Sequence, residues 1–444
     1  MAGLMSDTNP PVEILTQSKT QVHNHPIDKV LETGNSMSEI AKTPFQRIEA
    51  YLKSKYDLCY NEVSNEVEFR KKGTEDEYQV LNSSTIYREL EHNGYKISIA
   101  NLEAILRSDF VIIHNPLTEY FENLDEWKSS DEDLIDKLAS HIIAPNQKRF
   151  NYHFKKALVR TVAGIMSPGF FNKHAFIIVG LEQNTGKTTF IRFLVPPALK
   201  DYFTENISTT DKDGLISLSE NFLINLDELA MLGKADINKL KSMFSMQRIK
   251  VRHPFGKKAQ ATPRRASFFG STNEDDFLID STGSVRWLCL EISGINFDYS
   301  LPGNIDINMV WAQAFQLFKS KSYVYQLTKA DLIENELVNQ KFRKNTAEYD
   351  LLLSNYIPGN IEDNNGFYTA SQFLEQLAPK STFFKLTPEK MGKALTALGF
   401  TKKQKRINNP YPEYGYYFKF RIDVEVPINE GTTLSINDDN PLTF

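Results

Sequence analysis

Residues 175–189 read Ala-Phe-Ile-Ile-Val-Gly-Leu-Glu-Gln-Asn-Thr-Gly-Lys-Thr-Thr, and this stretch decides the fold class. It opens with a continuous apolar run, which is typical of a strand buried on both faces of a parallel sheet. A polar loop follows, and a helix is predicted from Phe190 onward. A loop between a buried strand and a helix N-terminus presents backbone N–H groups to phosphate, and the helix dipole reinforces them. The pattern therefore predicts a phosphate-binding loop in an α/β fold.

The loop carries residue types that bind a nucleoside triphosphate. Gly186 allows close approach of the backbone, Lys187 reaches the β- and γ-phosphates, and Thr188 ligates Mg²⁺. The glycine that usually opens this motif is displaced, because Leu181 stands in its place and Gly180 comes one residue earlier. The loop alone leaves open a chance Gly-Lys-Thr in a strand-turn-helix. The residues expected to contact ATP are Gln183, Asn184, Thr185, Gly186, Lys187, Thr188 and Thr189.

A second apolar run, residues 222–226, ends in the acidic pair Asp227 and Glu228. A carboxylate at this place holds Mg²⁺ through water, and the next one orients the attacking water. We therefore expect Asp227 and Thr188 to form the metal site and Glu228 to activate the water. Acidic pairs after strands are common, so this pair indicates a metal site only in combination with the loop that precedes it.

A third apolar run, residues 266–270, leads through Ser-Thr to Asn273. An amide here is placed to contact the γ-phosphate or the attacking water, although asparagine at a strand end is often only a turn former. Strands of this kind that alternate with helical segments indicate an α/β core. In series, the three strand ends predict an ATPase that uses ATP and Mg²⁺.

Arg286 stands just before another apolar run. An arginine at this place can reach the γ-phosphate of a neighbouring subunit and stabilise charge in the transition state. An ordinary surface ion pair is the alternative. We count Arg286 with Lys187, Asp227, Glu228 and Asn273 as the predicted catalytic residues.

A basic hairpin is predicted between the acidic pair and Asn273. Arg248, Lys250 and Arg252 alternate with apolar residues, so a strand would place all three on one face. Phe255 in the turn is a candidate for contact with a base or sugar, and Arg264 and Arg265 add charge before the third strand. A DNA phosphate backbone is the expected partner, and a solvated edge hairpin protected by lysines is the alternative. Its turn adds the basic residues His253, Lys257 and Lys258.

The C-terminal part has a winged-helix pattern. A capping box at Thr369 opens one helix, Pro388 opens a second with Gly399 past its end, and a hairpin follows. The hairpin is basic, so we expect it to bind DNA, although winged-helix domains also bind proteins. The residues concerned are Lys402, Lys403, Lys405 and Arg406.

Composition and periodicity divide the remaining chain. Hydrophobic residues make up 41% and charged residues 24%, which suits a globular protein. The predicted parts are a disordered leader (1–44), a small α/β module (45–114), a helical collar or linker (115–166), the ATPase domain (167–345), the winged-helix-like domain (346–428) and a flexible tail (429–444).

The bulk numbers also bound the compartment and the partners. No apolar stretch is long enough to span a membrane, and the polar N-terminus is not a secretory signal. The two cysteines, Cys59 and Cys289, suggest neither a disulfide framework nor a cysteine zinc site, so a reducing cytoplasm is expected. The net charge of −5 argues against wholesale coating of nucleic acid, so DNA contact should be confined to the basic hairpins.

Together these motifs resemble the virulence-associated E family, the superfamily-3-helicase-like AAA+ ATPases of phage, plasmid and satellite elements. The resemblance covers residues 115–345 and, more weakly, residues 45–115. It implies an AAA+ core, a hexameric ring with ATP sites between subunits, and Arg286 as an arginine finger acting in trans. It also implies pore hairpins, here residues 252–258, that track one DNA strand. The likeness lies in residues 182–194, 225–229, 251–256, 269–273 and 280–286, with 115–124 before them.

The leading hypothesis is an ATP-dependent DNA helicase or replication motor of a mobile element. It would hold single-stranded DNA in a central pore, with duplex DNA as a partner of the C-terminal domain. An ATP-regulated DNA-binding initiator without unwinding activity, and an AAA+ ATPase acting on a protein partner, are the two alternatives.

Overall fold

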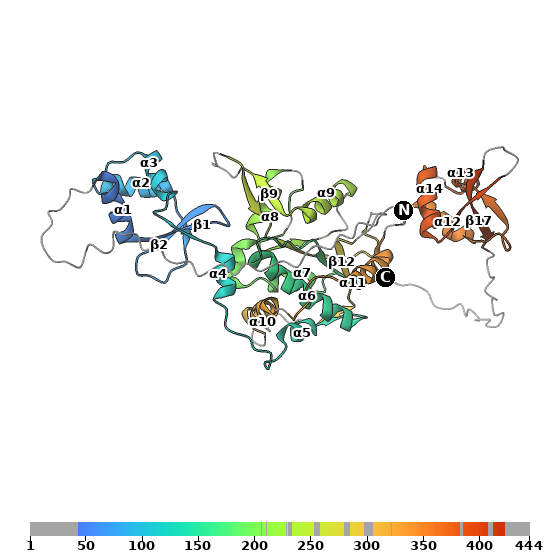
Figure 1. Ribbon diagram of the computed structural model, residues 1–444, viewed down its shortest axis with the longest axis horizontal. Helices are drawn as coiled ribbons and strands as arrows, with labels where there is room; N and C mark the ends of the chain where they lie inside the picture. Colours follow the sequence, from blue (N-terminus) through green and yellow to red (C-terminus); the bar gives the residue numbers. More distant parts are fainter. Residues whose placement is uncertain are drawn as a thin grey trace, which may run out of the picture. The chain divides into compact units, whose positions relative to one another are not determined.

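The computed structural model describes residues 43–205, 207–209, 211–227, 229, 233–252, 258–278, 285–296, 305–320, 322–343, 345–381, 385–406 and 412–421 (Figure 1). The predicted leader, apart from its last two residues, and the whole predicted tail lie outside these ranges. The chain divides into two compact units. One comprises residues 1–60 with 66–112, and the other residues 61–65 with 113–444. The other predicted domain boundaries stay predictions.

The first unit is a small α/β unit, as its sequence pattern predicts. Its helices pack their apolar faces together around Leu52, Leu90 and Leu102, each of which is fully buried. The sheet order is β3-β2-β1-β4, in which the predicted hairpin supplies β1 and β2. The elements are α1 (Pro44–Lys55), β1 (Tyr56–Asn61), β2 (Glu66–Lys71), β3 (Gln79–Val80), α2 (Ser83–His92) and α3 (Ile99–Leu106). The last strand of the sheet is β4 (Ile112–His114), and the division into units falls after its first residue.

The second unit contains a five-stranded parallel sheet with the order β12-β6-β11-β8-β7. All three predicted buried strands are confirmed, and each of them is buried along its whole length. Because every connection within this sheet is parallel, the carboxyl ends of the strands meet at one edge. The strands are β6 (Ala175–Val179), β7 (Phe203–Glu205), β8 (Leu223–Leu226), β11 (Ser267–Thr272) and β12 (Trp287–Glu291).

Two hydrophobic clusters cover the two faces of this sheet. Alternate side chains of β6 divide between them: Phe176 and Ile178 join the first cluster, and Ile177 joins the second. The first cluster is completed by α4 (Pro116–Glu122), α5 (Leu134–Ala139), α6 (Gln147–Met166), α7 (Lys187–Phe193) and α10 (Ile307–Lys319). The second is completed by α8 (Lys212–Glu220), α9 (Lys234–Ser245) and β9 (Arg248–Val251), which pairs with β10 (Gln260–Pro263). The helices predicted for residues 115–166 are therefore present.

The helix α11 (Lys329–Asn339) has its polar side inward. Asn335 and Asn339 are fully buried, and each donates a hydrogen bond of 2.8 Å from its Nδ2 to the carbonyl of Trp287 on β12. Ile333 and Leu337, by contrast, are exposed. The polar side of α11 thus donates hydrogen bonds to a carbonyl of the edge strand β12. Amphipathic periodicity alone would have placed this polar side toward solvent. A short pairing of β5 (Ile142–Ile143) with β13 (Gly294–Ile295) lies elsewhere in this unit.

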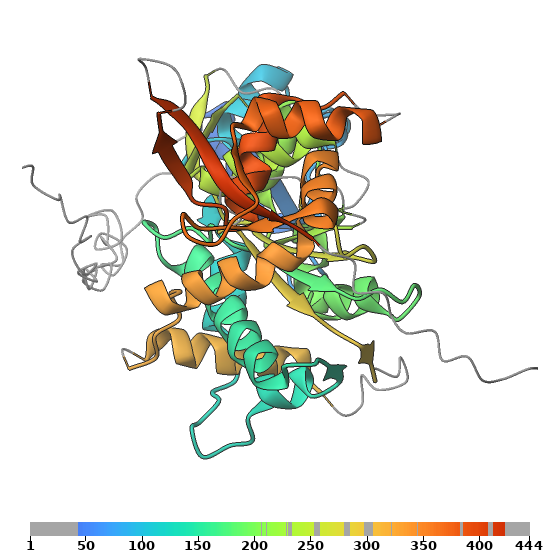
Figure 2. The same ribbon diagram turned by 90° about the vertical axis from the view of Figure 1, so that its right-hand side faces the viewer.

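The C-terminal segment has the predicted order of helices and hairpin. Thr369 and Gln372 form a capping box, Pro388 opens the later helix, and Gly399 has a φ of +85° just past its end. Figure 2 shows this segment in orange and red, with helices packed against the long strand β17. The elements are α12 (Ala347–Asn355), β14 (Tyr356–Pro358), β15 (Gly366–Tyr368), α13 (Ala370–Leu377), α14 (Pro388–Ala397), β16 (Lys402–Lys405) and β17 (Glu413–Phe420). Among the described residues, no helix is long and apolar enough to cross a membrane.

Candidate nucleotide site and nucleic-acid surfaces

The predicted phosphate loop is a tight turn between β6 and α7. Gly180 directly follows β6, and a Cβ there would meet Ile292 Cγ1 at 2.9 Å, so a larger residue would force its neighbours to shift. Asn184 and Gly186 have φ values of +56° and +85°, a region that glycine adopts without strain. Because Gly186 caps α7 without a side-chain hydrogen bond, the first backbone N–H groups of the helix face the loop.

Lys187 is folded back onto the loop. Its Nζ donates hydrogen bonds to the carbonyls of Gly180 at 3.0 Å and Glu182 at 2.7 Å, and to Thr185 Oγ1 at 3.0 Å. The residue is 6% exposed. Burial lowers the pKa of Lys187, and the nearby carboxylates of Glu182 and Asp227 oppose that effect. The ammonium group is therefore held among oxygen acceptors that phosphate oxygens can replace.

Asp227 is the point at which three segments converge. Thr188 Oγ1, at the start of α7, donates to Asp227 Oδ1 at 3.1 Å. Ser271 Oγ, on β11, donates to the same oxygen at 3.1 Å. Hydroxyl and carboxylate oxygens are the ligands that Mg²⁺ prefers, so the donor set fits that ion. The sequence predicted that Thr188 and Asp227 act together but gave no role to Ser271, although this serine lies in the stretch 269–273 that carries the family resemblance.

Asn273 and Arg286, two of the other predicted catalytic residues, lie at opposite ends of the sheet strands. Asn273 directly follows β11 at the same sheet edge and is exposed. Glu228 lies outside the described residues. The carbonyl of Arg286 accepts a hydrogen bond of 2.9 Å from the N–H of Ala175, at the opposite end of β6 from the loop. Since β6 has five residues, the backbone of Arg286 lies about 16 Å from the loop of its own chain. Its Nε donates to Ser245 Oγ at 2.9 Å.

A cavity of about 420 Å³ adjoins the loop. The volume is within the usual range for small-molecule pockets. Leu181 and Thr185 line one side, and Ile292 and Phe342 come from the segments after β12 and α11. Glu291 and Lys341 form an ion pair of 4.0 Å in its lining. Sequence reasoning did not find this cavity, because its walls come from segments that are far apart in the chain.

The predicted basic hairpin is present as β9 and β10. Arg248 and Lys250 are exposed while Ile249 and Val251 are buried, which confirms the alternation. Arg252 and Lys258 are exposed beyond the strands. The turn residues His253, Phe255 and Lys257 lie outside the described residues.

Arg264 and Arg265 do not extend this basic surface, contrary to the expectation from their charge. Arg264 is 1% exposed, and its Nη1 donates to the carbonyls of Met243 and Phe244 at the C-terminal end of α9. Burial lowers its pKa to about 9. Arg265 donates a hydrogen bond to the carbonyl of Ser219 and forms an ion pair with Glu62. Both arginines therefore fasten the base of the hairpin to the helices behind it.

The C-terminal basic residues lie on one exposed strand and its end. Lys402, Lys403 and Lys405 of β16 and the following Arg406 are all exposed. Lys402 Nζ lies 5.2 Å from the ring centroid of Tyr414, an exposed residue of the paired strand β17. The strand thus combines cationic and aromatic groups on one surface.

The solved structures that are similar to this chain include three of the C-terminal region of NrS-1 in its apo form. The first has a TM-score of 0.48 and 12% identity and covers 85% of this chain and 99% of that one. The others have TM-scores of 0.46 and 0.42, identities of 11% and 13%, and cover 84% and 80% of this chain and 98% and 87% of the other chains. No curated protein matches the chain.

The family comparison covers half of the chain. Residues 122–344 match the Virulence-associated protein E-like domain. The matched range contains the loop at Lys187, the carboxylate of Asp227, the strand that ends at Ser271, and the basic hairpin. The chain belongs to the virulence-associated protein E-like domain family.

Proposed function

We propose that this protein is an ATP-driven DNA motor, a helicase or related replication ATPase of a mobile element, with an AAA+ core and a winged-helix C-terminal domain. The observation that carries the proposal is the meeting of Thr188 and Ser271 on Asp227, next to a lysine held in a phosphate-type loop. This arrangement needs three segments to converge at one sheet edge, and it suits Mg²⁺-dependent handling of a triphosphate better than any other chemistry of these side chains.

Each residue of this site has a separate role in the hydrolysis of ATP. Lys187 leaves the loop carbonyls and binds the β- and γ-phosphates, together with the N–H groups at the start of α7. Thr188 and Asp227 hold Mg²⁺, which when bound neutralises charge that develops on the phosphate oxygens. Glu228 orients the attacking water, and Asn273 contacts the γ-phosphate. The cavity beside Leu181 and Phe342 takes the nucleoside.

Arg286 acts on a neighbouring subunit. It starts at the edge of the sheet opposite its own loop, so it is poorly placed to reach a phosphate held by the same chain. A ring of copies, which we take to be a hexamer, brings this arginine to the next nucleotide. There it stabilises charge in the transition state.

DNA contact is assigned to two exposed basic surfaces. The β9–β10 hairpin carries Arg248, Lys250 and Arg252 toward single-stranded DNA in the ring, and His253, Lys257 and Lys258 extend the same segment. The strand β16 binds duplex DNA through its exposed lysines. Phosphate contacts of this kind do not read sequence, so tracking along a strand is the activity they suit.

The test is steady-state ATP hydrolysis with and without single-stranded DNA, at two salt concentrations. We expect Lys187→Ala to abolish hydrolysis. We expect Lys250→Ala combined with Arg252→Ala to keep basal hydrolysis but to weaken stimulation by DNA. Loss of two phosphate contacts should lower the slope of log affinity against log salt by about 1.4. Lys128→Ala, which removes an exposed lysine from a different region, is the matched control.

Two outcomes would replace the proposal. Hydrolysis that needs Lys187 but ignores DNA would favour an ATPase acting on a protein partner. DNA stimulation without strand displacement, together with tight binding of one duplex sequence, would favour an ATP-regulated initiator. Near-normal hydrolysis in Lys187→Ala would refute the nucleotide site itself.

A further inference from the structure

An exposed aromatic ring lies on the C-terminal hairpin formed by β16 and β17. Tyr414 on β17 is 58% exposed, whereas Tyr416 and Phe418, which follow on the same face of that strand, are buried in the core against the helices. The apolar face of β17 thus extends past the part that the helices cover. A large ring that is held on a strand but left open is a surface on which a flat ligand can stack.

A cation and an amide lie on the same face as this ring. In the pairing of β16 with β17, Gln404 is opposite Tyr414 and Lys402 is opposite Tyr416, and residues that are opposite each other share a face of the sheet. Lys402 Nζ lies 5.2 Å from the centroid of the Tyr414 ring, within the range of a cation–π interaction. Lys402 and Gln404 are both exposed. The ring, the ammonium group and the amide therefore form one open surface.

The positive charge of this hairpin is not neutralised by a carboxylate in the part of the chain that the structure describes. Residues 402–406 carry four basic side chains, and none of them forms an ion pair with a described residue. Two other lysines of the C-terminal segment are neutralised, since Lys393 pairs with Glu389 and Lys419 pairs with Asp363. Because the whole chain has a net charge of −5, such a cluster of cations indicates an anionic ligand.

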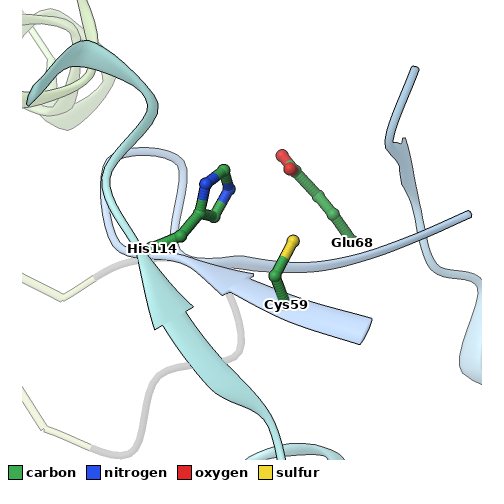
Figure 3. Close-up of side chains that lie close together, drawn as sticks. All are labelled: Cys59, Glu68 and His114. Atoms are coloured by element: carbon green, nitrogen blue, oxygen red, sulfur yellow. The ribbon is translucent and has the colours of Figure 1, made fainter. Parts of the chain in front are cut away.

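A similar cation–tyrosine pair in the first unit shows the difference. Tyr78 is 37% exposed, and the Cζ of Arg70 lies 4.8 Å from the centroid of its ring. Arg70 lies on β2, the strand that carries Glu68 in Figure 3. Its Nε also forms an ion pair of 3.3 Å with Asp57. The charge beside Tyr78 is therefore neutralised within the protein, whereas the charge beside Tyr414 is available to phosphate.

These groups match a nucleotide whose base is unpaired. Lysine and arginine bind the phosphates of any DNA strand, and an aromatic ring stacks on any exposed base. A closed duplex keeps its bases stacked on one another, so it would contact the basic residues but not the ring of Tyr414. An acidic peptide would also contact only the basic residues. The ring and the cations together therefore favour DNA that has an unpaired base next to the contacted phosphates.

We infer that the β16–β17 hairpin binds DNA at a junction between duplex and single strand, with the first unpaired base stacked on Tyr414. The inference rests on the proposed contact of the β16 lysines with duplex phosphates, and it adds the position along the DNA at which this contact is made. A base held on the ring is kept from pairing again, which suits a protein that separates strands.

The test is DNA binding by the full-length protein without ATP, measured by fluorescence anisotropy. A labelled blunt duplex is compared with the same duplex carrying an unpaired arm of about four nucleotides. We expect the DNA with the arm to bind more tightly. Tyr414→Ala should weaken that binding by at least about 5-fold, the loss of one base stack, and should leave binding of the blunt duplex unchanged. Tyr414→Phe, which keeps the ring, should bind both DNAs as the wild-type protein does.

An abasic residue makes the test specific to stacking. Replacing the first unpaired nucleotide by one without a base keeps the phosphate and removes only the base. This DNA should bind the wild-type protein as weakly as the intact DNA binds Tyr414→Ala, and the two changes together should cause no further loss. Tyr78→Ala is the matched control and should change neither affinity, because it removes an exposed tyrosine beside a cation that Asp57 neutralises.

The inference would be overturned if the wild-type protein bound both DNAs equally, or if the abasic residue had no effect. It would also be overturned if Tyr414→Ala changed both affinities equally or not at all. Lys403→Ala combined with Lys405→Ala tests the proposed duplex contact separately and should weaken binding of both DNAs. If it does so while Tyr414→Ala has no effect, the junction inference alone fails. If it changes neither affinity, the proposed contact of β16 with DNA fails as well.

Discussion

Replacing Ser271 by alanine tests the geometry around Asp227 most directly. Ser271 is 3% exposed and donates a hydrogen bond of 3.1 Å to Asp227 Oδ1, as Thr188 does. A hydrogen bond to a charged group contributes about 1.5–3 kcal/mol, and the lower part of that range applies because Asp227 is only partly buried. About 1.4 kcal/mol corresponds to a tenfold change. We therefore expect kcat/KM for Mg-ATP to fall by about tenfold.

The assay is ATP hydrolysis as a function of Mg²⁺ concentration. Ser271→Ala should need more Mg²⁺ for half-maximal activity, because Asp227 is less well oriented to hold the ion. Ser267→Ala is a matched control, since Ser267 is a buried serine at the other end of β11, about 13 Å away, and accepts a hydrogen bond from Asn172. An unchanged Mg²⁺ dependence in Ser271→Ala, or the same shift in Ser267→Ala, would refute the reasoning.

Two further predictions concern stability. Arg264→Met should lower the free energy of unfolding by about 3–5 kcal/mol, because it removes the guanidinium group that donates to the buried carbonyls of Met243 and Phe244. Arg248→Met, on the exposed face of the hairpin, should change it by less than about 0.5 kcal/mol, and equal melting temperatures for the two variants would contradict the burial of Arg264. Burial lowers the pKa of His153 to about 3, so the folded chain resists protonation that the unfolded chain accepts. The contribution of neutral His153 to the free energy of unfolding is therefore fully present above pH 6.5. It should be lost as the pH falls toward 3, by up to about 1.4 kcal/mol per pH unit. In melting temperatures measured from pH 7.5 to 5, His153→Gln should flatten this slope and the exposed His92→Gln should not; equal slopes would show that His153 is not the group responsible.

Local patterns in the sequence were enough for the secondary structure around the nucleotide loop. A continuous apolar run marked β6, because a strand covered on both faces needs no polar side. The capping box at Thr369 and the left-handed Gly399 marked helix ends, because these interactions span only a few residues. The alternation of Arg248 and Lys250 with buried neighbours follows from the period of a strand.

The tertiary structure decided what depends on segments that are distant in the chain. Charge alone could not show that Arg264 is buried, because its carbonyl partners belong to a helix that ends some twenty residues earlier. The inward polar side of α11 depends on an edge-strand carbonyl that no periodicity reveals. Ser271 reaches Asp227 only because β8 and β11 are neighbours in the sheet. Sequence by itself therefore determined the helices and strands around the loop, whereas the partners of each side chain were set by which strands and helices pack together.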